Sequence, residues 1–384
     1  MSIYLDNAAT SFPKPESVYQ AVDHAMRQVG TSPGRGGHRR SLEAARIMFK
    51  AREAIAGLFS IPDSSRIIFT HNATGALNLA LHGTLLPGDH VITTSMEHNS
   101  LLRPLRALGK SAVEVTVVPA GGDGLVDPDD IRKNLKRNTR MVAVGHMSNV
   151  CGAVQPIDRI AALCHEADAI FLVDAAQSAG SINIDVLSTG IDMLAAPGHK
   201  GLLGPPGTGF LYVAPHVTVK PILEGGTGTD STSEEQPLTM PDGFEAGTHN
   251  LPGIAGLKAG IDFIRERGMD ALFQHELNLL DEVMFQLRSI RGLTFYGPEE
   301  GQRGGVLSFT ISGIDASLLA AELDQRFDIA VRAGLHCAPQ AHRTLGTFPD
   351  GTLRLSPGWA NTSEEIAFFS DAVVQCVKSL RETF

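Results

Sequence analysis

The chain has 384 residues, of which 43% are hydrophobic and 19% are charged, and its formal net charge is −10. This length predicts two domains rather than a single small one. The negative charge argues against nucleic acid or an anionic membrane surface as the main partner.

The sequence shows no targeting or metal-binding pattern. No apolar run approaches the ~18 residues of a membrane-spanning helix, and residues 1–6 have neither the basic nor the apolar region of a secretory signal. The cysteines Cys151, Cys164, Cys337 and Cys376 are scattered without the spacing of a metal site. We therefore expect a cytoplasmic protein with reduced thiols, no membrane contact and no bound metal.

Residues 1–250 predict an α/β arrangement, because short apolar strands alternate with helices. A strand at 3–5 and a loop come first, followed by helices at 16–29 and 41–59. Further strands are expected at 66–70, 91–94, 113–117, 141–144, 170–173, 192–196 and 209–213. Such alternation is typical of a mostly parallel central sheet flanked by helices. The Gly/Ser/Thr/Pro-rich segment 225–248 predicts a long functional loop or an arm between subunits.

Residues 251–384 predict a smaller α+β domain. Helices are expected at 252–267, 269–290, 315–326 and 363–381, and strands at 306–311, 329–332 and 352–355. The irregular stretch 333–351 contains Cys337. We therefore expect an N-terminal arm at 1–15 that packs with the small domain, a large domain at 16–250 and a small domain at 251–384.

Polar side chains follow five of the predicted strands, at the point where each strand ends. They are Thr74, His98, Asn149, Asp174, Gln177, His199 and Lys200. In open α/β sheets the carboxyl ends of the strands form the ligand crevice. We therefore expect these residues to meet in one site.

Lys200 follows an apolar run and has glycines and prolines on both sides in the sequence. These residues favour a stiff turn over a helix. A pyridoxal phosphate enzyme needs such an amine for a Schiff base and a carboxylate on the pyridinium nitrogen. It also needs phosphate donors, often at a helix amino terminus, and a ring against the cofactor face. Lys200, Asp174, Thr74 and His98 can supply these four features. Taken singly, a lysine such as Lys200 is more often a solvated surface residue, and an aspartate such as Asp174 is more often a helix cap or turn residue.

Eight motifs in this order resemble those of the cysteine desulfurases, which belong to the class V aminotransferase group of fold type I pyridoxal phosphate enzymes. They are Tyr4-Leu5-Asp6-Asn7-Ala8-Ala9-Thr10, Met96-Glu97-His98-Asn99, Ser148-Asn149-Val150, Val173-Asp174-Ala175-Ala176-Gln177, Gly198-His199-Lys200, Phe244-Glu245-Ala246-Gly247-Thr248, Arg332-Ala333-Gly334-Leu335-His336-Cys337, and Arg354-Leu355-Ser356 with Asn361-Thr362. The resemblance implies a large cofactor-binding domain, a smaller α+β domain and a homodimer.

The resemblance also implies a role for each site residue. Lys200 would form the Schiff base and shuttle protons, with Asp174 on the pyridine nitrogen and His98 stacked on the ring. Gln177 would contact the ring hydroxyl, and Asn149 would face either that hydroxyl or the substrate. The implied phosphate ligands are Thr74, His199 and, from the other subunit, Thr248. Arg354 would clamp the substrate carboxylate, and Arg332 would assist it or orient the cysteine loop.

Cys337 decides which reaction the resemblance implies. It lies beside His336, with Arg332 and Arg343 near in sequence, and neighbouring cations favour a nucleophilic thiolate. We expect Cys337 to take sulfur from L-cysteine as a persulfide, release L-alanine and pass the sulfur to an acceptor protein, as in iron–sulfur cluster assembly. Cys164 and Cys376 lie on predicted helices and are expected in the core, and packing is also favoured for Cys151.

Two positions depart from the family pattern. Pro197 and Ala73 stand where related enzymes often carry residues with hydroxyl groups. Phosphate binding would therefore depend more on Thr74, His199, Thr248 and backbone amides. Three alternatives stay open: a selenocysteine lyase acting on L-selenocysteine, a C–S lyase or aminotransferase of the same group, and a sulfur-relay scaffold without turnover.

Overall fold

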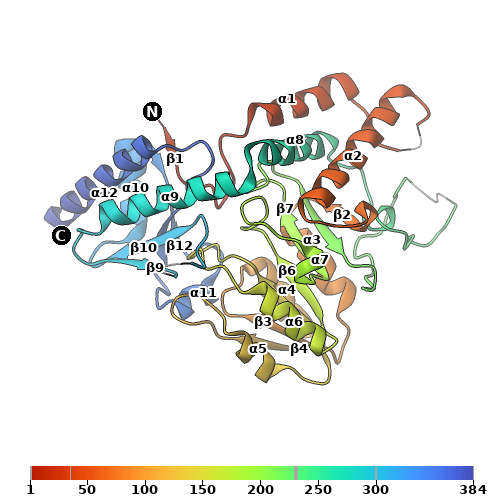
Figure 1. The fold of residues 1–384 in the computed structure, drawn as a ribbon, viewed down its shortest axis with the longest axis horizontal. Coiled ribbons are helices and arrows are strands. Elements are labelled where there is room, and N and C mark those ends of the chain that lie inside the picture. Colours follow the sequence, from red (N-terminus) through yellow and green to blue (C-terminus); the bar gives the residue numbers. More distant parts are fainter. Residues whose placement is uncertain (1, 35, 229–231, 299–300, 384) are drawn as a thin grey trace.

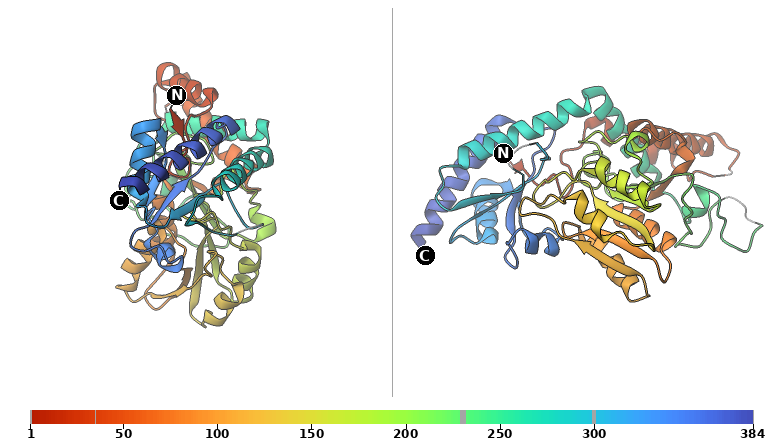
Figure 2. Two further views of the ribbon diagram at one scale, coloured as in Figure 1. Left: turned by 90° about the vertical axis from the view of Figure 1, so that its left-hand side faces the viewer. Right: turned by 60° about the horizontal axis from the view of Figure 1, so that its bottom comes forward.

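A long helix, α9 (Met269–Leu287), leads from a larger α/β part of the molecule to a smaller part, where both ends of the described chain lie (Figure 1). The computed structural model describes residues 2–34, 36–228, 232–298 and 301–383. Figure 2 shows α9 arching over the junction between the two parts.

The larger part is built around a seven-stranded sheet in the order β2-β8-β7-β6-β5-β3-β4. Every neighbouring pair is parallel except those of β8, which runs antiparallel to β2 and β7. The strands are β2 (Ile67–Thr70), β3 (His90–Thr94), β4 (Glu114–Val118), β5 (Thr139–Gly145), β6 (Ile170–Asp174), β7 (Met193–Pro197) and β8 (Gly209–Val213). Strands β3, β6, β7 and β8 are buried throughout, as expected beneath helices. The predicted mostly parallel α/β sheet is confirmed.

Helices flank this sheet, and several begin just past a strand. They are α1 (Glu16–His24), which continues as a π-helical turn (Ala25–Val29), α2 (Arg39–Leu58), α3 (Ala73–Thr84), α4 (Asn99–Gly109), α5 (Pro128–Asn134), α6 (Ile157–Glu166), α7 (Val186–Thr189) and α8 (Leu251–Arg267). The side chains of Asn72 and His98 accept hydrogen bonds from the first turns of α3 and α4. These caps fix where the chain leaves a strand and begins a helix.

The smaller part has an antiparallel sheet in the order β12-β13-β10-β9. Its strands are β9 (Leu293–Tyr296), β10 (Leu307–Ile311), β12 (Arg332–Gly334) and β13 (Thr352–Leu355), and its helices are α9, α10 (Ala316–Phe327), α11 (Pro339–Thr344) and α12 (Ser363–Thr383). A separate parallel pair joins β1 (Ile3–Tyr4) to β11 (Ile329–Ala330). This pair ties the start of the chain to the smaller part.

Three details differ from the sequence-based expectation. The predicted strand 329–332 is divided into β11 and β12, which pair with different strands. The stretch 333–351 is not wholly irregular, because it contains α11. Helix α8 was placed with the small domain, yet its buried side chains belong to the larger hydrophobic core, while those of α9 from Leu279 onward belong to the smaller one. We therefore propose that the division between domains falls within α9.

A buried ion pair connects α2 with the end of the long loop at 225–248. Arg52 donates to both carboxylate oxygens of Glu245, at 2.9 and 2.7 Å. The Glu245 side chain is only 1% exposed and also accepts from the backbone N–H of Phe69 in β2. Removal of one partner would leave a desolvated charge without a counterion, which is costly.

Glu245→Ala is therefore expected to lower the free energy of unfolding by about 3–5 kcal/mol. The matched control is Glu43→Ala, which removes the exposed partner of Arg46 on the same helix and should cost about 1 kcal/mol or less. Urea denaturation followed by circular dichroism measures both. Equal losses for the two variants would contradict the stabilising role of the buried pair.

Candidate active site

The seven strand-end residues predicted to meet do line one cavity of about 170 Å³. It lies at the carboxyl edge of the large sheet, past the ends of β2, β3, β5, β6 and β7. The residues are Thr74, His98, Asn149, Asp174, Gln177, His199 and Lys200. These strands all point the same way, because β2 and β7 both run antiparallel to β8.

The amino terminus of α3 supplies hydrogen-bond donors at one end of this cavity. Asn72 caps the helix through the N–H of Gly75, at 2.8 Å. Among the described residues, the N–H groups of Ala73 and Thr74 have no backbone partner, and both residues line the cavity. Unpaired amides at a helix start favour an anion such as a phosphate. This arrangement suits a phosphate even without hydroxyl groups at positions 73 and 197.

Asp174 and Lys200 carry opposite charges within the cavity, and each favours the ionised form of the other. Burial raises the pKa of Asp174, against hydrogen bonding by the Ala176 N–H and the charge of Lys200. That N–H donates to Oδ1 at 2.9 Å, and the described residues show no further hydrogen bond to this carboxylate. Burial lowers the pKa of Lys200 to about 8, against the charge of Asp174. The site therefore holds a desolvated carboxylate, that of Asp174, and an amine, that of Lys200, which is neutral in about half of the molecules near pH 8.

Both imidazoles of the cavity are neutral at physiological pH. Burial lowers the pKa of His98 to about 4, with Lys200 adding to the effect, and it lowers that of His199 to about 4 as well. The Nδ1 atom of His98 lies 2.7 Å from the Ser100 hydroxyl, and that of His199 lies 3.1 Å from the Thr10 hydroxyl. Uncharged rings held in this way suit stacking or hydrogen bonding better than ion pairing.

Glu97, which was not singled out from the sequence, also lines the cavity. Its carboxyl group lies 2.6 Å from the Thr94 hydroxyl and accepts from the Gly145 N–H at 2.8 Å. Burial raises its pKa to about 8, and the charge of Asp174 acts in the same direction. Glu97 is therefore mostly protonated at pH 7. A glutamate directly before His98 gave no sequence signal for this, because its burial depends on the neighbouring strand β5.

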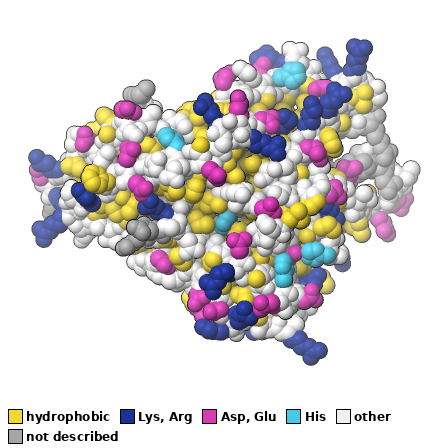
Figure 3. Space-filling view, in the orientation of Figure 1, with side chains coloured by type: hydrophobic (Ala, Val, Ile, Leu, Met, Phe, Trp, Pro, Cys, Tyr) yellow, Lys and Arg dark blue, Asp and Glu magenta, His cyan; other side chains and the backbone are white. Residues whose placement is uncertain are grey.

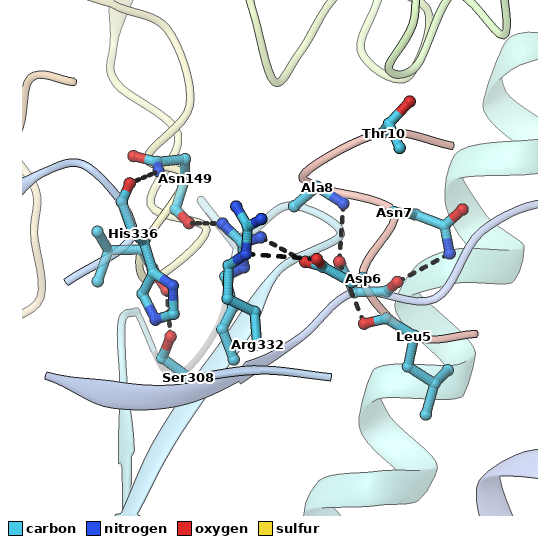
Figure 4. Close-up of polar contacts among 12 residues, drawn as sticks. Leu5, Asp6, Asn7, Ala8, Thr10, Asn149, Ser308, Arg332 and His336 are labelled. Carbon is cyan, nitrogen blue, oxygen red and sulfur yellow. Dashed lines mark hydrogen bonds and ion pairs between the residues drawn. The ribbon is translucent and has the colours of Figure 1, made fainter. Parts of the chain in front are cut away.

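Asp6, Arg332, Asn149 and His336 belong to one group of polar contacts (Figure 4). Arg354, only 1% exposed, donates to the Asn149 carbonyl at 3.0 Å and to the Asp6 carboxylate at 2.6 Å. The other oxygen of Asp6 lies 3.4 Å from Nε of Arg332, whose side chain is 47% exposed. The side-chain amide of Asn149 in turn donates to the His336 carbonyl at 2.6 Å.

Cys337 is exposed and lies at an open groove that also contains Thr74 and His98. Its carbonyl accepts from the Asn99 N–H at 2.8 Å, which fixes the loop beside the start of α4. The sequence argument that His336 is a positive neighbour is wrong. Burial lowers the pKa of His336 to about 2, and its Nε2 contacts the Thr352 hydroxyl, so the ring is neutral.

The remaining cysteines and Thr248 lie away from the cavity. Cys151 packs in a small cluster beneath the cysteine loop, and Cys164 and Cys376 lie in the two main cores, as expected. Thr248 lines a separate surface cavity of about 310 Å³ together with His71 and Glu245. The structure of a single chain thus does not bring Thr248 to the other site residues.

The N-terminal arm contacts the cavity as well as the small domain. Gln177, predicted to contact the cofactor, donates to the Ala8 carbonyl at 3.0 Å. The Ser11 hydroxyl donates to the Lys200 carbonyl at 3.0 Å. Lys14 donates to the His199 carbonyl at 2.8 Å, and burial lowers its pKa to about 8. The sequence-based placement of the arm against the small domain alone omits these contacts.

Comparisons with known proteins agree with this geometry. The family model for Aminotransferase class-V matches residues 3–369. A probable cysteine desulfurase of Methanothermobacter thermautotrophicus is 38% identical, over 97% of this chain and 94% of that protein. The apo structure of the cysteine desulfurase from Thermococcus onnurineus NA1 superposes with a TM-score of 0.91 at 34% identity, over 98% of this chain and 95% of that one. The cysteine desulfurase CsdA of Escherichia coli gives 0.88 at 28% identity, over 98% and 95%.

The lowered pKa of Lys200 can be tested by carbamylation with cyanate, whose acid form, isocyanic acid, is attacked by neutral amines and is small enough to enter the cavity. In protein freed of any cofactor, the rate constant for Lys200, expressed per concentration of isocyanic acid, should rise with pH and reach half of its maximum near pH 8. At pH 8 it should outpace Lys133 by roughly a hundredfold or more, because the exposed Lys133 stays protonated beside Asp130.

Peptide mass spectrometry follows both lysines, and Lys14 should also react early. In Asp174→Asn the midpoint for Lys200 should move to lower pH, since the charge of Asp174 raises the pKa of Lys200. Parallel rates for Lys200 and Lys133 at all pH values would show that the amine is not perturbed.

Proposed function

We propose that this chain, which belongs to the class-V aminotransferase family and within it to the cysteine desulfurases, converts L-cysteine to L-alanine and keeps the sulfur as a persulfide on Cys337. The observation that supports this most directly is the arrangement of Lys200, Asp174 and His98 around one cavity, with an exposed cysteine in the groove that opens beside it. The reaction needs both an amine that handles a proton and a thiol that reaches the substrate sulfur.

The residues present fit pyridoxal phosphate as the cofactor. The Asp174 carboxylate is buried with a single N–H donor in the described structure, and a protonated pyridine nitrogen would supply its missing counter-charge. Thr74, His199 and the free amides of α3 would hold the phosphate, with His98 against the ring and Gln177 or Asn149 near its hydroxyl. When bound, this cofactor stabilises negative charge that develops at the substrate α-carbon.

The chain's own residues would then orient the substrate and move its protons. Arg354 would offer its guanidinium to the substrate carboxylate, and the planar fork of a guanidinium suits bidentate binding of a carboxylate. Lys200, neutral in a large fraction of molecules, accepts the α-proton at Nζ and later returns a proton to carbon. The neutral ring of His98 adds no charge to the site.

Sulfur transfer would take place at Cys337. Its thiolate Sγ forms a bond to the substrate sulfur while the carbon–sulfur bond breaks, and the electron pair of the broken bond stays on carbon. Protonation of that carbon yields alanine, and the sulfur remains on Cys337 as a persulfide. Because Cys337 is exposed, an acceptor protein or a small thiol can remove this sulfur. L-Selenocysteine is a second substrate of the same chemistry.

We further propose a homodimer in which Thr248 reaches the partner's cavity. Within its own chain Thr248 lies in a different cavity, so a role at the phosphate requires a second copy. The proposed cytoplasmic setting rests on four free thiols and a net charge of −10. On the face drawn in Figure 3, basic and acidic side chains are intermingled. In the part of the chain that the structure describes, no helix combines the length and apolarity needed to span a membrane.

Cys337→Ala should bind pyridoxal phosphate with an unchanged absorption band, yet release no sulfide from L-cysteine in the presence of a thiol reductant. The control Cys164→Ala removes a thiol from the larger core and should keep its activity. Labelled cysteine separates the reaction classes. Alanine as the product indicates desulfuration, pyruvate indicates elimination, and the absence of both products indicates a scaffold without turnover. Full sulfide release by Cys337→Ala would eliminate the persulfide role.

Complementation between subunits tests the crossing of Thr248. Lys200→Ala alone should be inactive, and Thr248→Glu alone should bind the cofactor poorly, because a carboxylate repels the phosphate. Co-expressed, the two chains form mixed dimers in which one site has both Lys200 and a partner's Thr248. These dimers should recover about half of the wild-type activity per dimer. If activity does not recover although mass spectrometry confirms mixed dimers, Thr248 does not act at the partner's cavity.

A further inference from the structure

Asp6 lies between Arg354 and Arg332, the two arginines that the proposed function assigns to the substrate carboxylate. One carboxylate oxygen is 2.6 Å from Nη2 of Arg354, and the other is 3.4 Å from Nε of Arg332. The Asp6 side chain is only 14% exposed. A carboxylate from the N-terminal arm therefore already uses part of the binding capacity of the guanidinium that would clamp the substrate.

The three groups act on Lys200 as well as on one another. The charges of Arg354 and Arg332 lower the pKa of Lys200, whereas that of Asp6 raises it. All three are thus close enough to the cavity for their charges to be felt there. Two guanidiniums and one carboxylate together give a net charge of +1, which a single α-carboxylate neutralises.

Arg354 retains unused hydrogen-bonding capacity despite its two contacts. Its Nε is buried and has no hydrogen-bond partner among the described residues. Within the described structure, its Nη1 and Nη2 atoms each make one hydrogen bond, to Asn149 and Asp6, although each carries two hydrogens. Asp6 therefore holds this guanidinium in place without saturating it.

We propose that Asp6 is a specificity-determining residue, which limits the arginine pair to one unit of net positive charge and so favours amino acids with a single carboxylate over those with a second carboxylate on the β-carbon. This inference rests on the proposed function, because it takes Arg354 and Arg332 as the carboxylate site. L-Alanine and the thiol form of L-cysteine belong to the favoured class, and L-aspartate belongs to the disfavoured one.

Because Arg354 and Asp6 are largely shielded from solvent, the net charge of Asp6 and the two arginines can strongly affect ligand binding. Arg354 is nearly inaccessible and Asp6 is mostly covered, so the interaction between charges is screened much less than on the surface. The other acidic side chains at the cavity cannot replace Asp6. Glu97 is mostly protonated at pH 7, and Asp174 is the partner proposed for the cofactor.

A purely structural role for Asp6 predicts something different. Other contacts of the arm also anchor it, including the hydrogen bonds from Asn7 and Ala8 to Ser356. If Asp6 only fastened the arm, its loss would weaken all ligands alike and lower the melting temperature. A charge-counting role instead changes the ratio of two affinities.

The test uses the holoenzyme and measures the dissociation constants of L-alanine and L-aspartate from the absorption of the bound cofactor. In Asp6→Asn the pair of arginines carries +2, so the ratio of the constants for alanine and aspartate should rise about tenfold. Arg332→Gln should lower the ratio by about threefold, the smaller effect reflecting its exposed side chain. The double variant restores +1, and its ratio should return toward that of the wild type.

Asp281→Asn serves as the matched control, since it also removes an aspartate paired with an arginine, here Arg303, but outside the site. Its ratio should equal that of the wild type. An unchanged ratio in Asp6→Asn, or no restoration in the double variant, would overturn the inference. If Asp6→Asn does not fold, Arg332→Gln alone decides, because an unchanged ratio there is equally contrary.

The proposed function is judged by a separate measurement on the same wild-type holoenzyme, the release of sulfide from L-cysteine. A wild-type protein that releases no sulfide from L-cysteine would refute the proposed function itself. A wild-type protein that is active, but whose Asp6→Asn variant binds alanine and aspartate in the original ratio, would refute only the role of Asp6.

Discussion

The removal of water from ionisable groups around Lys200 is the constraint on which the rest of the site depends. Burial is the largest cause of every pKa shift there: it raises the pKa of Asp174 and Glu97 and lowers that of Lys200 and His98. Charged groups in such surroundings need counter-charges close by. Each charge that a ligand brings is therefore matched against a charge that the protein has already desolvated.

This constraint explains the use of the N-terminal arm. The arm supplies a carboxylate to Arg354 through Asp6, and its Ser11 hydroxyl donates to the Lys200 carbonyl. One short segment thus contacts both the backbone of the lysine that would hold the cofactor and the guanidinium that would hold the substrate. The distance between these two functions is set by the backbone of the arm as well as by the packing of the two cores.

The sequence predicts most of the fold and the large-domain half of the site, for a topological reason. Parallel strands place their carboxyl ends at one edge, so residues such as Asp174 and Lys200 can be grouped without knowledge of any contact. The apolar strands and amphipathic helices were likewise evident, because periodicity is a local property.

The features that the sequence did not predict depend on contacts that are remote along the chain. Asp6 and Arg354 are separated by 348 positions, and neither local pattern indicates the other. The neutral state of His336 follows from burial against Thr352, whereas the sequence shows only its neighbours Arg332 and Cys337. The division of strand 329–332 likewise reflects two different pairing partners, β1 and β13.

The loop that carries Cys337 combines an exposed thiol with a fixed backbone. His336 and Cys337 both have positive φ angles, 46° and 58°, a conformation that costs a residue with a Cβ atom about 1–2 kcal/mol. Hydrogen bonds from the Asn149 side chain and from the Asn99 N–H hold the carbonyls of these two residues. Both donors lie just beyond strands of the large sheet, so the sheet that positions Lys200 also positions the cysteine. Under the proposed function, the thiol can then face both the cavity and an acceptor without unfolding of its loop, and the strain in the two residues is offset by the contacts that aim it.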